Sequence, residues 1–335
     1  MEVPTAGGTP LSDIIVGCCM MLLSLACACA YSFILVMLWR DDDLMKMPSY
    51  KLMFTLGVFD VIQCVPHFVT GIFTILQSVG NPILAKAMGV LATPAYVAYT
   101  VLTVVLSLNR FLQIYSPRLD SILFSAKGVN NWIGFSTIVW FLFACALSSP
   151  WAAILYLPNF YSWEYDYELS YSWLVQRTEM VIELGTILVS ALFYILVIIA
   201  LYRTRKRFMA KSNSHTEMKI LIQALVITVY CTVLNFLWHN SQRFLPLNIW
   251  TYMTLNMMWI LNSGVYPIIY FIVNRVIRQK FHTRRVHTHE KSIITKHPHK
   301  SSSDEPKCKI SRVHFDGNQK LGDVIKNNTK VQILS

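Results

Sequence analysis

The stretch Ile14 to Leu38, which reads IIVGCCMMLLSLACACAYSFILVML, contains no charged side chain. A helix needs about 20 apolar residues to cross the hydrocarbon core of a bilayer, and this stretch is long enough. It exceeds the apolar core of a secretory signal peptide, and no basic segment precedes it. We therefore interpret it as the first membrane span of the protein.

Further apolar runs follow at about 50–76, 85–112, 131–157, 180–203, 218–239 and 248–273. Asp60 and Glu183 are the only acidic residues inside them. The whole chain is 54% apolar and 14% charged, a composition that excludes a soluble globular domain of this length. The sequence predicts an all-α membrane protein with a seven-transmembrane helix bundle over residues 14–273.

The Lys and Arg residues indicate how the bundle is oriented, because they accumulate in cytoplasmic loops. With residues 1–13 outside the cell, nearly all of the 29 Lys and Arg residues fall on the inner side. The net charge of +11 is then a topology signal, which favours contact with anionic membrane lipids rather than with nucleic acid. Basic residues 274–283 predict an amphipathic helix on the inner membrane face, and residues 284–335 predict a disordered cytoplasmic tail.

The second outer loop, residues 158–179, alternates aromatic residues with Glu164, Asp166 and Glu168. Alternation of this kind predicts a β-hairpin that covers the outer end of the bundle. The alternative is a belt of aromatic side chains at the membrane interface. The outer loops contain no Cys, so we expect no disulfide between them, and the acidic residues would disfavour an anionic ligand.

Several seven-helix classes are excluded by missing side chains. Residues 248–273 contain no Lys for a retinal Schiff base, and no cluster of His and acidic residues inside the bilayer could hold zinc. We expect no enzyme activity, no cofactor and no metal site. A signalling receptor is favoured. A ligand-gated channel or transporter is the alternative, although such proteins usually carry several intramembrane charges and only Asp60 lies deep here. A partner subunit without a ligand of its own also remains open.

The inner end of the third run carries Asn109 and Arg110, with Pro117 after them. This pattern resembles the Asp-Arg-Tyr motif of the rhodopsin-like receptors, which Pro follows at the same spacing. A long cation at the inner mouth can hold the bundle shut by pairing and can later meet a partner's carbonyl oxygens. Because Asn109 is not acidic, we hypothesise that Arg110 pairs with Glu217 in the resting state. The alternative is an Arg that reaches the lipid headgroups.

The seventh run contains NSGVYPIIY at residues 262–270, which resembles the receptors' Asn-Ser-x-x-Asn-Pro-x-x-Tyr pattern. Pro267 permits a kink, and the resemblance makes Pro267 and Tyr270 part of the switch. Asp60 follows a stretch similar to the receptors' second-helix motif. A buried acid needs polar partners, and the resemblance implies Asn262 and Ser263. The alternative for Asp60 is a neutral carboxyl with a packing role.

Other features depart from the ordinary rhodopsin-like pattern, because the fifth run has no Pro and the sixth has no Cys-Trp-x-Pro. A closer similarity is to the nematode serpentine receptors of class T. It rests on SYKLMFTLGVFDVIQ at 49–63, LSLNRF at 106–111 and YPIIYFIVNRVIR at 266–278. The resemblance implies a chemosensory receptor of the cell membrane, in the cilia of sensory neurons, that couples to a heterotrimeric G protein.

We expect a small external ligand to bind between the outer halves of the helices, where apolar walls surround a few polar groups. His67 stands out because an intramembrane His is rare, and it lies two turns from Asp60 on the same helix face. Packing or interfacial roles are the alternative for each candidate. The candidates are Gln63, His67, Tyr96, Tyr99, Glu183, Asn235, Trp238, His239, Tyr252, Asn256 and Trp259.

Overall fold

The computed structural model describes residues 8–208, 229, 231–241, 244–246 and 248–273. All of these described residues belong to one compact unit. Three sequence predictions lie outside the described residues: the pairing of Arg110 with Glu217, the amphipathic helix at 274–283 and the tail at 284–335.

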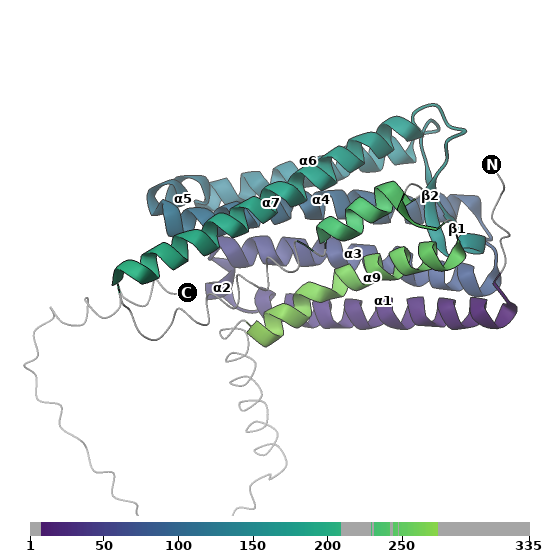
Figure 1. Ribbon diagram of the computed structural model, residues 1–335, viewed down its shortest axis with the longest axis horizontal. Helices are drawn as coiled ribbons and strands as arrows, with labels where there is room; N and C mark the ends of the chain where they lie inside the picture. Colours follow the sequence, from purple (N-terminus) through teal and green to yellow (C-terminus); the bar gives the residue numbers. More distant parts are fainter. Residues whose placement is uncertain (1–7, 209–228, 230, 242–243, 247, 274–335) are drawn as a thin grey trace, which may run out of the picture. The chain divides into compact units, whose positions relative to one another are not determined.

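Long helices laid side by side make up this unit (Figure 1). They are α1 (Pro10–Trp39), α3 (Pro48–Leu76), α4 (Pro82–Tyr115), α6 (Ala126–Ser148), α7 (Ser172–Phe208) and α9 (Ile249–Val273). Among the described residues, α1, α3, α4, α6 and the first part of α7 are long and apolar enough to cross a membrane. Residues 231–241 are also helical, and with α9 they occupy the places of the remaining predicted spans.

Local sequence explains where the helices begin. Pro occupies the first position of α1, α3, α4 and of α5 (Pro117–Leu123), where its missing N–H costs no hydrogen bond. Polar caps precede two of these helices. Asn81 accepts a hydrogen bond from the backbone N–H of Ile83 at 2.8 Å, and Thr9 accepts one from that of Ser12. The short helix α2 (Asp42–Met45) connects α1 to α3.

Helix α4 lies at the centre of the bundle and packs against α3, α6 and α7. In the most apolar segment of α4, 83% of the residues are buried. In the corresponding segment of α6, 17% are buried. The apolar face of α6 is therefore left for lipid, because without lipid such an exposed surface would be unfavourable in water. Helix α9 packs against α1 and α3.

Helices α1 and α3 approach closely where two glycines face each other. A Cβ atom on Gly71 would meet the Met21 side chain and the backbone carbonyl oxygen of Gly17. A Cβ atom on Gly17 would in turn meet the backbone of Gly71 and the side chain of Ile75. Small residues permit such close backbone contact between membrane helices, which gains dispersion energy.

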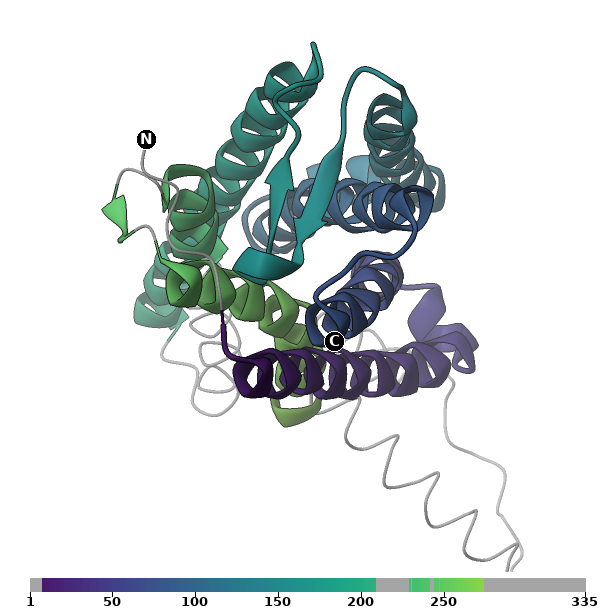
Figure 2. The same cartoon turned by 90° about the vertical axis from the view of Figure 1, so that its right-hand side faces the viewer.

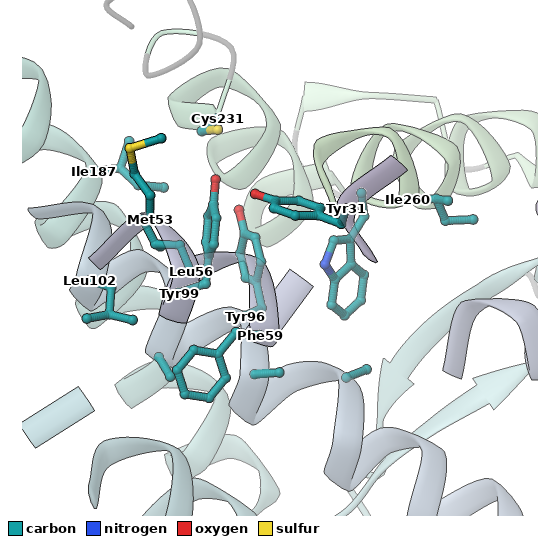
Figure 3. Close-up of a cluster of buried hydrophobic side chains, with 14 of the residues drawn as sticks. Tyr31, Met53, Leu56, Phe59, Tyr96, Tyr99, Leu102, Ile187, Cys231 and Ile260 are labelled. Atoms are coloured by element: carbon teal, nitrogen blue, oxygen red, sulfur yellow. The ribbon is translucent and has the colours of Figure 1, made fainter. Parts of the chain in front are cut away.

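The buried core of the bundle is rich in aromatic side chains (Figure 3). Tyr96 and Tyr99 of α4 lie side by side, with ring centroids 5.7 Å apart, and the hydroxyl of Tyr31 points toward them. This aromatic layer joins α1 to α4. It lies against Cys231 of the sixth predicted span and Ile260 of α9 (Figure 3).

The structure corrects the outer end of the fourth predicted span. The apolar run places this end at residue 157, but α6 ends at Ser148 and Ile154–Leu157 form strand β1. Strand β1 pairs antiparallel with β2 (Ser162–Tyr165), and the 3-10 turn η1 (Pro158–Phe160) connects them. A short apolar run is compatible with either a helix or a buried strand, so hydropathy alone could not distinguish them.

Candidate functional site

The β1–β2 hairpin lies across the outer mouth of the bundle, between the ends of the long helices (Figure 2). Tyr156 pairs with Trp163 across the two strands. Their rings meet edge to face with centroids 5.4 Å apart, and both side chains are buried. The predicted hairpin therefore exists. Its first strand comes from the fourth apolar run, and only its second strand from the loop that alternates aromatic and acidic residues.

The tip of the hairpin is fixed to the first and last helices. The Tyr161 hydroxyl donates a hydrogen bond to the Asp13 carboxylate of α1 and lies 3.2 Å from the Ser12 hydroxyl. Asn256 Nδ2 of α9 donates to the backbone carbonyl oxygen of Tyr161 at 2.9 Å. Burial, together with the Asp13 carboxylate, raises the pKa of Tyr161, so its hydroxyl stays a donor.

The two strands are fixed to α3, α4 and α7. The Tyr156 and Thr74 hydroxyls are 2.6 Å apart, which joins β1 to α3. Ile154 fills the space where a Cβ atom of Gly89 in α4 would lie. Tyr165 of β2 donates to the Glu179 carboxylate of α7. No disulfide joins the described cysteines, so hydrogen bonds and packing hold the hairpin in place.

A small chamber lies beneath the hairpin. Its walls come from α4, α7, residues 231–241 and α9, and its volume is about 10 Å³, room for about one water molecule. The residues that line it are Tyr96, Glu179, Glu183, Leu234, Asn235, Trp238 and Trp259. A volume this small admits no larger ligand unless the side chains around it move.

Polar groups in the chamber wall form a buried cluster. His239 Nε2 lies 3.0 Å from Glu183 Oε2, and both side chains are only 2% exposed. Glu179 lies one helical turn before Glu183 on α7 and lines the same chamber. The Tyr96 hydroxyl donates to Asn235 Oδ1 at 3.0 Å. Glu183 Oε1 and Asn235 Nδ2 have no hydrogen-bond partner among the described residues.

A second set of contacts extends from the chamber toward the centre of the bundle. Trp259 Nε1 donates to Gln63 Oε1 at 3.1 Å, and Gln63 Nε2 donates to Asp60 Oδ1 at 3.4 Å. The ring of His67 meets Trp259 edge to face, with centroids 4.9 Å apart. His67 is fully buried, and neither ring nitrogen has a hydrogen-bond partner among the described residues.

Asp60, Asn262 and Ser263 are all buried, as a polar core requires. The hydrogen bonds described for Asp60 and Asn262 nevertheless run to other residues. Asp60 accepts from Gln63, and Asn262 Oδ1 accepts from Cys231 Sγ at 3.0 Å. Within the described residues no direct hydrogen bond joins Asp60 to Asn262 or to Ser263. Pro267 lies inside α9, and Tyr270 falls in the last turns of the same helix.

The inner end of α4 carries a hydrogen-bond network centred on Asn109. Asn109 Nδ2 donates to Asp120 Oδ1 at 2.9 Å, and its Oδ1 accepts from the Ser49 hydroxyl at 2.6 Å. Pro117 begins α5, and this short helix carries Asp120 back to Asn109. Burial raises the pKa of Asp120, while the hydrogen bond from Asn109 and the charge of Arg110 partly oppose the shift.

Arg110 is half-buried beside this network, and no ion pair to it is found within the described part of the chain. The predicted partner Glu217 lies outside that part. The neighbouring Phe111 stacks on Phe193 of α7 with ring centroids 5.6 Å apart. The inner end of α4 is thus joined to α3, α5 and α7.

Most of the residues predicted for the outer half of the bundle lie at or beside the chamber. Tyr96, Glu183, Asn235, Trp238 and Trp259 line the chamber. Four other candidates adjoin it: His239 pairs with Glu183, Tyr99 stacks on Tyr96, and Gln63 and His67 contact Trp259. Asn256 and Tyr252 contact the hairpin instead, because Tyr252 meets Phe160 edge to face.

Two chamber residues were missed, Glu179 and Leu234. The sequence predicts that the outer loop ends at Glu179, but α7 begins earlier, at Ser172. The spacing of four residues between Glu179 and Glu183 was the available signal, since side chains four apart share a helix face. Leu234 carries no feature that separates it from other apolar residues of its helix.

Comparison with known proteins defines the class of this bundle. The crystal structure of squid rhodopsin superposes with a TM-score of 0.64 at 16% sequence identity, over 82% of this chain and 85% of that chain. The fold is therefore that of the rhodopsin-like seven-helix receptors. A comparison with curated proteins finds no match.

The family follows from the sequence itself. Residues 8–293 match the family described as serpentine type 7TM GPCR chemoreceptor Srt, and the chain belongs to this family. It is a multi-pass membrane receptor of the G-protein-coupled kind and not an enzyme. The predicted fold class, the resemblance to class T serpentine receptors and the predicted receptor function are confirmed.

Proposed function

We propose that this chemoreceptor binds a small external molecule in the chamber beneath the β1–β2 hairpin and transmits binding to a heterotrimeric G protein at its inner end. The N-terminus and the hairpin lie on the extracellular side in this proposal, as the loop charges indicate. Residence in the ciliary membrane of sensory neurons belongs to the same proposal and rests on the resemblance alone.

The observation that carries the proposal is the composition of the chamber wall. Aromatic side chains surround a few polar groups, and two buried polar atoms, Glu183 Oε1 and Asn235 Nδ2, lack partners among the described residues. Buried polar atoms without partners are costly, so a ligand that satisfies them gains affinity. A small molecule fits this wall better than a peptide, because the hairpin covers the mouth.

Helix α4 supports the connection between the two ends. It carries Tyr96 in the chamber wall and Arg110 at the inner end, and it packs against α3, α6 and α7 along its length. A ligand that binds one arrangement of these helices better than another shifts the equilibrium toward it. Arg110, which has no ion pair in the described part of the chain, is the group we assign to the G protein.

Expression with heterotrimeric G proteins tests the proposal, with nucleotide exchange measured against a chemically diverse set of odorants. Arg110→Ala should abolish exchange at unchanged surface expression, and Arg118→Ala, at an exposed position of α5, is the matched control. Trp238→Ala should lower agonist potency at least tenfold. Signalling that survives Arg110→Ala, or ligand-evoked currents in proteoliposomes without G protein, would contradict the proposal.

A further inference from the structure

We infer that the chamber recognises a small protonated amine, whose ammonium group lies between Glu179 and Glu183 and against the faces of Trp238 and Trp259. This inference rests on the proposed function, because it names the chemical class of ligand for the same chamber. It is carried by the charges, burial and unpartnered atoms of the chamber wall.

Two carboxyl groups meet in the wall at a place that water scarcely reaches. Glu179 is 4% exposed and Glu183 is 1% exposed, and the two side chains lie about one helical turn apart on α7 in the same chamber wall. Two carboxylates this near each other at low dielectric repel, so they take up protons or hold a cation. The pair is therefore poised to accept a positively charged group.

The neighbouring groups do not neutralise the pair. Tyr165 donates one hydrogen bond to Glu179, and His239 lies 3.0 Å from Glu183 Oε2. If His239 is neutral and the two Glu side chains share one proton, the cluster carries one negative charge. If His239 is protonated and both Glu side chains are ionised, the cluster again carries one negative charge. Arg177, the nearby Arg on α7, is exposed to solvent. A ligand with a single positive charge matches either arrangement.

The hydrogen-bonding needs of the wall match an ammonium group as well. Glu183 Oε1 has no donor among the described residues, although the side chain is almost fully buried. An ammonium group brings three donors and no acceptor, so it can satisfy this oxygen and a Glu179 oxygen together. A ligand carboxylate would instead place a third negative group in the cluster.

The aromatic walls favour the same charge. Trp238 and Trp259 meet edge to face with centroids 5.2 Å apart, and Tyr96 meets Trp259 with centroids 5.8 Å apart. All three line the chamber. The faces of such rings attract cations, most strongly where water is excluded. The small volume favours a short amine, which binds as the side chains of the wall move apart.

Short primary alkylamines, the alcohols of the same carbon skeleton and the matching carboxylates test the inference in cells that co-express the receptor and G protein. Amines should activate the wild type, and the alcohols and carboxylates should be weaker. Glu183→Gln and Glu179→Gln should each lower amine potency about 10- to 100-fold, the effect of removing a charged hydrogen-bond partner. Glu164→Gln, at an exposed position of β2, is the control and should leave potency unchanged.

Several outcomes would overturn the inference. They are alcohols as potent as amines on the wild type, no activation by any amine, or unchanged amine potency in Glu183→Gln. The wild-type comparison needs no variant, so it decides even if the substituted receptors fail to reach the surface. If a neutral odorant activates the receptor and this activation is lost in Arg110→Ala, the proposed function stands and the assignment of an amine ligand fails. Absence of G-protein activation by the whole odorant set would instead count against the proposed function.

Discussion

Asn256 of α9 donates a hydrogen bond from Nδ2 to the backbone carbonyl oxygen of Tyr161 at 2.9 Å, while the Tyr161 hydroxyl donates to Asp13 of α1. One residue at the tip of the hairpin thus joins the first helix to the last. In this position the hairpin cannot lift without breaking hydrogen bonds at both helices. Lifting the hairpin would therefore disturb α9, which also carries Trp259 in the chamber wall.

Tyr161→Phe should loosen the hairpin. The substitution leaves the buried Asp13 carboxylate without its donor, at an expected cost of about 1–3 kcal/mol in the free energy of unfolding. Thermal unfolding in detergent, followed by a thiol-reactive dye that labels the buried Cys27, Cys64 and Cys231, measures the change. Tyr167→Phe is the control, because the Tyr167 hydroxyl bonds Gln176 at an exposed site. Equal melting temperatures for the two variants would contradict the structural role of Tyr161.

Gly71→Ala should destabilise the bundle through the contact of α1 with α3. The added methyl group meets the Gly17 carbonyl oxygen and Met21, and overpacking of this kind costs about 1–3 kcal/mol. Gly134→Ala is the control, since nothing lies within 4 Å of the new Cβ atom and the residue is inside α6. Ala should favour that helix by about 0.5–1 kcal/mol. The thiol-reactive dye measures the melting temperatures of both variants. If Gly71→Ala raises the melting temperature, α1 and α3 do not approach closely at this position.

Asp120→Asn should stabilise the receptor at neutral pH. Burial raises the pKa of Asp120, so the folded state binds this proton more tightly than the unfolded chain does. The charged carboxylate therefore costs stability as pH rises above the ordinary carboxyl pKa, and this cost is absent in acid. The asparagine oxygen can still accept from Asn109. The melting temperatures of the wild type and of Asp120→Asn should be equal in acid and should separate as the pH rises to neutral. A constant difference would contradict the prediction.

Gln63→Leu should destabilise the centre of the bundle. Gln63 is fully buried, and it accepts from Trp259 Nε1 while it donates to Asp60. The apolar side chain leaves the indole N–H unpaired, which costs about 1–3 kcal/mol. Gln63→Glu keeps the acceptor for Trp259 but places a second acid beside Asp60, and it should also lower the melting temperature. If Gln63→Leu melts with the wild type, the hydrogen bond to Trp259 does not stabilise the fold.

Much of this receptor can be predicted from its sequence, because a bilayer imposes strong rules on run length and loop charge. The polar residues of the outer helix halves were also recognised, since such residues are rare among apolar neighbours. Hydropathy failed at residues 154–157, where an apolar run of four residues forms a strand. Such a run is buried in either structure, so its composition does not reveal which one forms.

Run lengths and motifs were enough to predict that the chain spans a membrane as a helix bundle and that Asn109 takes the place of the usual acid beside Arg110. Each of these properties depends on local composition. The tertiary structure alone decided which distant residues meet: Tyr161 with Asp13, which lie 148 residues apart, and Glu183 with His239, which lie 56 apart. The rotation of each helix about its axis depends on packing against its neighbours, and that rotation placed two acids, a histidine and three aromatic rings around one small chamber.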